Sequence, residues 1–158
     1  MPKTILKGSV VLIGGGGKNL GGLLSRTFAA EGAKVALHFN SESSRAEAEK
    51  TVADITAAGG EALAFQGDFT KPPEIAAFFA AAKAHFGGID IAINTVGKVL
   101  KKPFLETTEE EYDEMAAVNA KAAYFFIQEA GRHLNDGGKI LTVVTSLLAA
   151  YTGLYSTY

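Results

Sequence analysis

Residues 14–22 read Gly14-Gly15-Gly16-Gly17-Lys18-Asn19-Leu20-Gly21-Gly22, with six glycines in nine residues. It follows an apolar run at residues 9–13 and overlaps the start of a segment, residues 19–31, whose apolar residues recur at steps of three and four. A glycine-rich turn between a strand and a helix lets backbone N–H groups approach a pyrophosphate at the helix N-terminus, where the helix dipole favours negative charge. The stretch therefore predicts a dinucleotide site.

Two other interpretations of this turn compete with the first. A P-loop requires a glycine five residues before Gly17-Lys18 and a Ser or Thr after them, but the chain has Leu12 and Asn19 at those positions. The P-loop interpretation therefore fails at both ends. A tight turn that binds nothing stays open, although four successive glycines cost conformational entropy that a plain turn does not need.

Short β-branched runs alternate with helical patterns along the rest of the chain, as is typical of βαβ units around a parallel sheet. Strands are expected at residues 9–13, 34–39, 62–66, 89–93 and 139–145, and helices at 19–31, 43–58, from 72 onward and at 108–134. Thr108 and Glu111 have the spacing of a capping box for the last helix. The predicted fold class is α/β, a Rossmann-type doubly wound parallel sheet of about five strands with right-handed crossovers, in one domain over residues 1–158.

Composition excludes several classes of protein. Fifteen basic and seventeen acidic residues give a net charge of -2, without the positive excess that nucleic-acid binding needs. The absence of cysteine excludes disulfides, a thiolate nucleophile and Cys-ligated zinc, and His38, His85 and His133 are too far apart in the sequence to predict a metal site. No apolar run reaches the roughly 18 residues of a membrane span, so we expect a cytoplasmic protein with no membrane partner.

From about residue 8 to residue 158, the chain resembles the short-chain dehydrogenase/reductase family. The cofactor turn of that family, T-G-x-x-x-G-x-G, falls on Gly14, Gly15, Asn19 and Gly21, with Gly14 in place of the Thr and Asn19 in place of the middle Gly. Asn adopts left-handed conformations more readily than other non-glycine residues, so the second replacement is physically tolerable. The resemblance implies that this turn holds the pyrophosphate of a nicotinamide dinucleotide.

Two further motifs extend the resemblance. Residues 67–70, Gly-Asp-Phe-Thr, follow the third expected strand, and Asp68 with the next backbone amide resembles the clamp for the adenine ring. Residues 94–97, Asn-Thr-Val-Gly, are similar to the N-N-A-G motif, with Thr in place of the second Asn. Asp68 and Asn94 could also simply cap strand-to-loop transitions, because both residue types are common in turns. The resemblance implies these cofactor-binding residues: Gly15, Lys18, Asn19, Leu20, Gly21, Asn40, Ser41, Asp68, Phe69, Asn94, Val96 and Gly97.

The end of the second expected strand indicates which cofactor is preferred. In Rossmann folds an acidic residue there binds the ribose 2′-hydroxyl of NAD, but this chain has Phe39 at that place and no carboxylate at residues 39–41. A carboxylate would repel a 2′-phosphate, so its absence favours NADP(H) over NAD(H). Lys18, Asn40, Ser41 and Arg45 could supply cations and donors, unless Lys18 is merely a solvated loop residue.

The resemblance also implies catalytic residues. Tyr158 matches the family's acid/base Tyr, Ser146 or the neighbouring Thr145 its substrate-orienting hydroxyl, and Asn119 its relay Asn. Asn119 shares a helical face with apolar residues, so its amide must find partners there. The family's Lys, four residues after the Tyr, would be residue 162, so we expect the sequence to be the N-terminal part of a longer chain.

The implied function is an NADPH-dependent carbonyl reductase or alcohol dehydrogenase, similar to 3-oxoacyl reductases and acting on a small-molecule carbonyl or alcohol. A non-catalytic NADP(H)-binding sensor or partner-binding protein is the alternative. Related enzymes pair through the long helix that here contains Glu111 to Leu134 and through the helix that begins near Tyr158, so a homo-oligomer, a dimer or tetramer, is also expected. Ala120 and Tyr124 lie on the outward face of the first of these helices.

Overall fold

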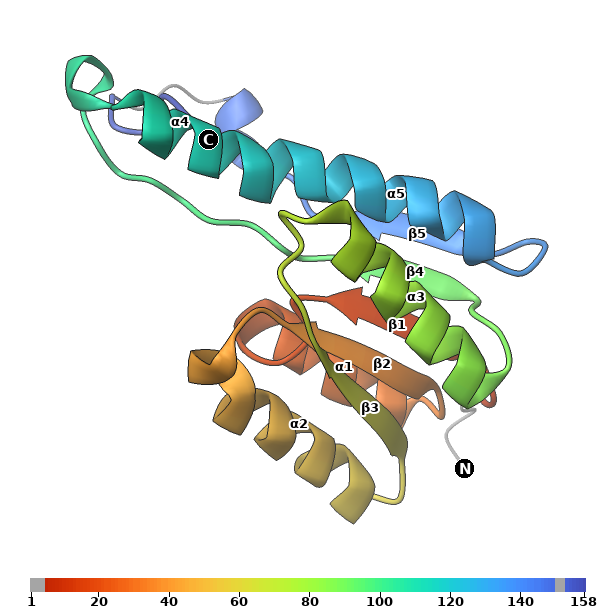
Figure 1. The fold of residues 1–158 in the computed structure, drawn as a ribbon. Helices are drawn as coiled ribbons and strands as arrows, with labels where there is room; N and C mark the ends of the chain where they lie inside the picture. Colours follow the sequence, from red (N-terminus) through yellow and green to blue (C-terminus); the bar gives the residue numbers. More distant parts are fainter. Residues whose placement is uncertain (1–4, 150–152) are drawn as a thin grey trace.

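The computed structural model describes residues 5–149 and 153–158, which form a five-stranded parallel sheet with the strand order β3-β2-β1-β4-β5 (Figure 1). The strands are β1 (Val10–Gly14), β2 (Lys34–Phe39), β3 (Glu61–Gln66), β4 (Ile91–Asn94) and β5 (Lys139–Thr142). All four strand pairs are parallel. This confirms the predicted doubly wound α/β fold.

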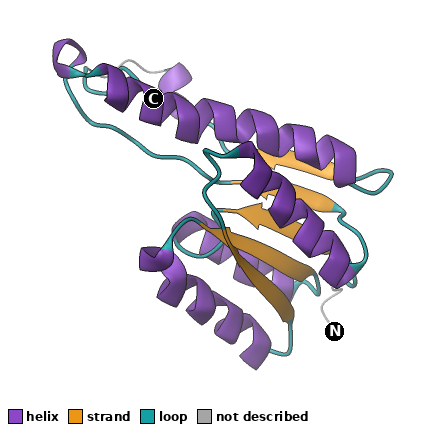
Figure 2. Ribbon diagram, viewed as in Figure 1, coloured by secondary structure: helices purple, strands orange, loops and turns teal. Residues whose placement is uncertain are grey.

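Helices cover both faces of the sheet (Figures 1 and 2). The helices are α1 (Asn19–Ala30), α2 (Arg45–Ala57), α3 (Pro72–Phe86), α4 (Glu109–Met115) and α5 (Ala122–His133). None of the helices in the described part of the chain is both long and apolar enough to cross a membrane.

The core consists of two layers, because successive side chains of a strand point to opposite faces. On one face Val10 and Leu12 pack with the buried side chains of α3 and α5, including Phe79 and Phe126. On the other face Val11 and Ile13 pack against α1 and α2. Burial on both faces explains why the first strand is a continuous apolar run without polar alternation.

The helix predicted at residues 108–134 is only partly confirmed. Its capping box is present, because the Glu111 N–H donates to the Thr108 hydroxyl at 3.3 Å and the Thr108 N–H donates to the Glu111 carboxylate at 2.9 Å. Between α4 and α5, however, Ala116–Lys121 form a π-helical stretch that contains Asn119. The spacing of apolar residues predicts ordinary helical turns and cannot encode this wider one, which is a common device near functional sites.

Strand β5 ends at Thr142, three residues before the predicted end at residue 145. Its neighbour β4 ends at Asn94, which pairs with Thr142, and the last ladder contact is the Val143 N–H donating to the Asn94 carbonyl at 3.0 Å. The apolar residues that follow have no strand to pair with in the described part of the sheet. The length of the strand therefore depends on its partner as well as on its own composition.

Candidate functional site

A cleft of about 680 Å³ opens at the carboxyl ends of the parallel strands. Beyond β1 the strand order reverses, with β2 and β3 on one side and β4 and β5 on the other. Such a switch point is where ligands bind in open α/β sheets, and the volume lies within the usual range for small-molecule sites. Nine predicted site residues line this cleft: Gly15, Lys18, Asn19, Leu20, Gly21, Asn40, Asp68, Val96 and Gly97.

The glycine turn connects β1 to α1 and forms one wall of the cleft. Gly15 has φ of 74° and Asn19 has φ of 49°, so Asn19 adopts the left-handed conformation expected of it. Gly21 packs directly on the carbonyl of Gly15, leaving no room for a Cβ atom. Glycine is therefore required at residue 21 for the close approach and at residue 15 for the positive φ.

Side-chain hydroxyl groups hold the carbonyl groups of this turn. Ser25 donates to the Gly16 carbonyl at 2.9 Å, Thr51 to the Gly17 carbonyl at 2.8 Å, and Thr95 to the Gly14 carbonyl at 2.7 Å. The first turn of α1 lines the cleft, and first-turn N–H groups have no acceptor within their own helix. The arrangement suits an anion such as a pyrophosphate.

The end of β2 carries no carboxylate, but acidic residues of the next helix lie nearby. Lys18 forms an ion pair with Glu47 of α2 at 2.9 Å, and both side chains stay about half-exposed. Arg45 lies 5.5 Å from the centre of the Phe39 ring and donates to Glu42 at 2.8 Å. Both cations are about half-exposed, and Lys18 lines the cleft, whereas Arg45 lies beside Phe39, which lines it.

Asp68 is firmly positioned after β3. Its carboxylate accepts hydrogen bonds from the hydroxyl and the N–H of Thr70, at 2.7 and 3.0 Å, and its own N–H donates to Glu74 at 2.5 Å. The hydrogen bond from the Thr70 hydroxyl is the largest effect that lowers the pKa of Asp68, which keeps the group ionised. The next side chain, Phe69, turns away from the cleft and is 2% exposed.

Ser41 and Asn94 also lie outside the lining of the cleft. The Ser41 hydroxyl contacts that of Ser43 at 2.9 Å. Asn94 is buried, and its side-chain oxygen accepts the Val96 N–H at 3.1 Å. Asn94 therefore shapes the loop that carries Val96 and Gly97 into the cleft.

The π-helical stretch is tied to the loop after β4. Asn119 accepts the Lys98 N–H and donates to the Lys98 carbonyl, both at 2.9 Å, so its amide has the partners that the sequence analysis required. Lys98 also forms an ion pair with Glu114 at 2.5 Å. These two charged side chains line the cleft together with Val118, whereas Asn119 is not among the lining residues.

The other two predicted catalytic residues, Ser146 and Tyr158, are not among the residues that line the cleft. Ser146 begins a short 3-10 turn, and Tyr158 is 39% exposed. The segment that ends at Tyr158 pairs with the loop after β4, where the Lys102 N–H donates to the Leu154 carbonyl at 3.0 Å (Figure 1). Within the described ranges no hydrogen bond joins Asn119, Ser146 and Tyr158, so their catalytic roles stay predictions.

Sequence reasoning assigned no ligand contact to several residues that line the cleft: Gly17, His38, Phe39, Ser44, Thr70, Thr95, Lys98, Glu114, Val118 and Val143. Thr95 was visible as part of the 94–97 motif, and His38 stands at the end of β2, but the others carry no local signal. Among the residues that the structure describes, no three His, Cys, Asp or Glu side chains lie close enough to hold a metal ion.

Comparison with known proteins agrees with this geometry. The family described as enoyl-(acyl carrier protein) reductase matches residues 17–158. A hydroxynaphthalene reductase-like protein Arp2 of Metarhizium brunneum is 36% identical over 149 residues, which cover 94% of this chain and 55% of that protein. The short chain dehydrogenase/reductase nsrJ of Aspergillus novofumigatus is 38% identical over 136 residues, covering 86% of this chain and 51% of that one.

A solved structure is also similar. The crystal structure of a putative dehydrogenase from Burkholderia cenocepacia with bound NADP has a TM-score of 0.93 and 60% identity, covering 97% of this chain and 58% of that chain. The chain thus spans about half the length of the curated relatives that it matches.

Proposed function

The chain belongs to the short-chain dehydrogenase/reductase family, and we propose that it is the cofactor-binding part of an NADP(H)-dependent oxidoreductase that interconverts a carbonyl compound and an alcohol. The observation that carries this proposal is the glycine turn, where Gly21 packs so closely on the Gly15 carbonyl that a Cβ would overlap it, and where the turn and the start of α1 form a cradle in the wall of the cleft. A dinucleotide pyrophosphate fits such a cradle.

The residues at the end of β2 support a preference for NADP(H), because none of them is a carboxylate. Phe39 stands where an NAD-selecting carboxylate would be, Arg45 lies 5.5 Å from its ring, and Lys18 lines the same cleft as Phe39. The similar Burkholderia protein has NADP bound. Because Lys18 pairs with Glu47 and Arg45 with Glu42, the gain from a 2′-phosphate is offset by the cost of weakening these exposed ion pairs.

The proposed chemistry divides between cofactor and protein. When bound, the nicotinamide supplies or accepts the hydride. Tyr158 donates the proton that the carbonyl oxygen needs to become a hydroxyl group, and Ser146 holds that oxygen by a hydrogen bond. Asn119 is proposed to act behind the Tyr in proton transfer, and its place in the π-helical stretch keeps it near the loop of Lys98.

Titration of the full-length protein with NADPH and NADH tests the cofactor proposal. We expect NADPH to bind more tightly and Phe39→Asp to reverse the order. Because Phe39 is only 5% exposed, Phe39→Asn is the matched control, which removes the ring without adding a charge. Equal affinities of the unmodified protein for the two cofactors would contradict the proposal.

The activity itself is tested by reduction of simple ketones and β-keto esters, followed by NADPH absorbance. Turnover of at least one such carbonyl is expected. Tight NADPH binding without turnover of any carbonyl would instead support a sensor or partner-binding protein.

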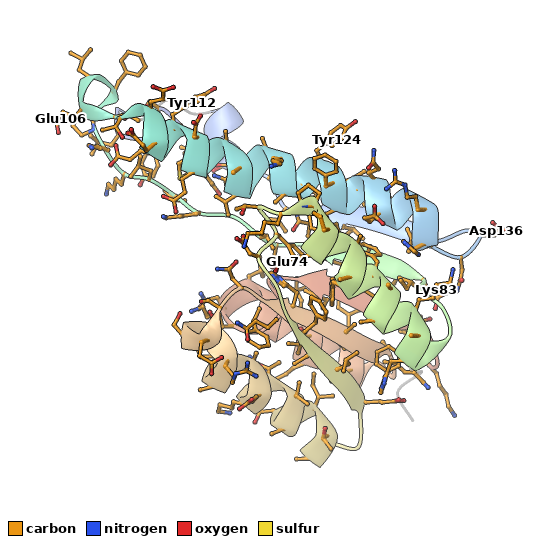
Figure 3. All side chains as sticks on the ribbon, viewed as in Figure 1. Glu74, Lys83, Glu106, Tyr112, Tyr124 and Asp136 are labelled. Carbon is orange, nitrogen blue, oxygen red and sulfur yellow. The ribbon has the colours of Figure 1, made fainter. Side chains whose placement is uncertain are left out.

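We also propose that the full-length protein is a homo-oligomer that pairs through the outward side of α4 and α5. Figure 3 shows Tyr112 and Tyr124 pointing away from the sheet, and their side chains are 59% and 63% exposed. Light scattering at micromolar concentration tests this proposal, and a monomer would contradict it.

A further inference from the structure

His38 is a buried polar residue that the proposed chemistry does not use. It lies near the end of β2, between β1 and β3, and its side chain is 2% exposed. The Gly15 N–H donates to Nδ1 at 3.0 Å, and Nε2 lies 2.7 Å from the Gly67 carbonyl oxygen. A backbone N–H can only donate and a carbonyl can only accept, so the ring must be neutral with its proton on Nε2.

The two partners of His38 belong to opposite walls of the cleft. Gly15 is in the glycine turn after β1, and Gly67 immediately precedes Asp68, which follows β3. The ring itself reaches the cleft and stacks on Phe69, with 3.5 Å between ring centres and 12° between planes. One side chain therefore joins the glycine turn, where the pyrophosphate is expected, to the Gly67–Asp68 segment, where the adenine ring is expected.

Glu74, at the start of α3, also holds the segment that contains Gly67 and Asp68 (Figure 3). Its carboxylate accepts the Asp68 N–H, while His38 donates to the carbonyl of the preceding residue. The position of Asp68 is thus determined by both side chains. Loss of the imidazole would leave the part-buried Gly15 N–H and the buried Gly67 carbonyl without their partner, and an unsatisfied buried group costs more than an ordinary hydrogen bond gains.

Burial of the His38 ring lowers its pKa, and nearby polar and charged groups offset only part of this effect. Burial lowers the pKa of His38 to about 4, although the Gly67 carbonyl and the carboxylates of Asp68 and Glu74 act to raise it. The ring is therefore neutral near pH 7. A protonated ring would place an N–H against the Gly15 N–H and lose that bond.

We propose that His38 is a positioning residue for the dinucleotide, whose neutral Nε2–H imidazole fixes the spacing between the glycine turn and Asp68. The proposal rests on the proposed cofactor-binding function. Since the imidazole bonds to the backbone of Gly15 and Gly67, and not to the residues proposed to select the 2′-phosphate, the proposal predicts an equal loss of affinity for NADPH and NADH.

Three variants separate the two hydrogen bonds. Asn places its side-chain oxygen near the position of Nδ1, Gln places its amide near the position of Nε2, and Phe keeps the ring shape with neither group. We expect His38→Phe to weaken both cofactors about tenfold or more, and His38→Asn and His38→Gln to weaken them less. His133→Gln is the matched control, because His133 also stacks on a phenylalanine, Phe79, but lies on α5 outside the cleft.

Measuring cofactor affinity and melting temperature together distinguishes the proposed positioning role of His38 from a purely structural role. It would lower the melting temperature of the His38 variants and leave the dissociation constants of the folded proteins unchanged. Nitrogen-15 NMR of the unmodified protein adds a readout that needs no variant to fold, with a neutral Nε2–H signature expected for His38 at pH 7.

His38→Phe or His38→Asn with unchanged affinity, or an Nδ1–H or cationic ring in the NMR spectrum, would overturn the inference while leaving the proposed function intact. An unmodified protein that binds neither cofactor would instead overturn the proposed function.

Discussion

Strands β1 and β5 show how differently the two ends of this chain are built. All five residues of β1 are buried, and the strand pairs with a neighbour on each side. In β5, Ile140 and Leu141 are 41% and 49% exposed, and the strand pairs with β4 alone among the described strands. The glycine turn leaves the well-packed strand, whereas Ser146 and Tyr158 follow the exposed one.

The proposed cofactor turn and the proposed catalytic residues therefore follow two differently packed strands. The cradle of the glycine turn is determined by packing around β1, with the hydroxyl groups of Ser25, Thr51 and Thr95 holding its carbonyl groups. The predicted proton donor, Tyr158, lies on the segment after β5 and is 39% exposed. We therefore expect substitutions in the two regions to change different measured quantities, which gives several ways to test the comparison.

The largest expected effect is on turnover in the C-terminal region. Tyr158→Phe keeps the ring but removes the hydroxyl, so turnover should fall by about 10² to 10⁴-fold while the dissociation constant of NADPH stays unchanged. Steady-state kinetics and cofactor titration of the full-length protein measure both quantities. Tyr155→Phe is the matched control, and full activity of Tyr158→Phe would rule out the proposed mechanism.

Ser146→Ala should reduce turnover in the same way, by about 10²-fold, if its hydroxyl orients the carbonyl oxygen. Thr145→Ala is the comparison, because the Thr145 hydroxyl accepts the Leu147 N–H at 3.1 Å and so has a local structural partner. A larger loss of turnover in Thr145→Ala would assign the orienting role to Thr145.

In the region around β1, His38 should make the free energy of unfolding depend on pH. Its pKa is about 4 in the folded protein and about 6.5 when unfolded, so between these values the unfolded state binds a proton that the folded state does not. The free energy of unfolding should therefore fall by about 3 kcal/mol as the pH decreases from 6.5 to 4, and should not change through His38 above that range.

Urea unfolding at pH 7, 6 and 5 measures this effect, and His38→Asn should remove it. The lowered pKa of Asp68 acts at more acidic pH, because the stability that it contributes is lost only as the pH falls below the ordinary aspartate pKa. An unchanged pH dependence in His38→Asn would show that another group is responsible.

Gly21→Ala should disrupt the glycine turn, because the added Cβ overlaps the backbone carbonyl of Gly15. We expect the dissociation constant of NADPH to rise about tenfold or more, with a lower melting temperature. Gly131→Ala is the control, since Gly131 lies in α5 and a Cβ there meets nothing within 4 Å. That change should stabilise the protein by about 0.5–1 kcal/mol. Unchanged NADPH binding in Gly21→Ala would contradict the role of the turn.

The smallest expected effect concerns the capping box of α4. Thr108→Ala removes the hydroxyl that accepts the Glu111 N–H, which should cost about 1 kcal/mol of unfolding free energy and leave NADPH affinity unchanged. Denaturant unfolding and cofactor titration test the two halves of this prediction. A change in affinity would show that the start of α4 is coupled to the cleft.

Much of this architecture could be predicted from the sequence, because its signals are local. The apolar run of β1, the turn at Gly15, and the capping residues Thr108 and Glu111 each act over a few neighbouring residues. The left-handed conformation of Asn19 also follows from its own chemistry. The residue type at position 39, and hence the lack of a carboxylate there, needs no structure at all.

Only the tertiary structure decided the contacts between distant residues. Lys18 meets Glu47 because α2 packs beside α1, and Asn119 meets the Lys98 backbone because a π-helical stretch faces the loop after β4. His38 joins its two partners because β2 lies between β1 and β3. These contacts depend on strand order and helix packing, which place residues about twenty or more positions apart within hydrogen-bond distance, and no local pattern of residues encodes them.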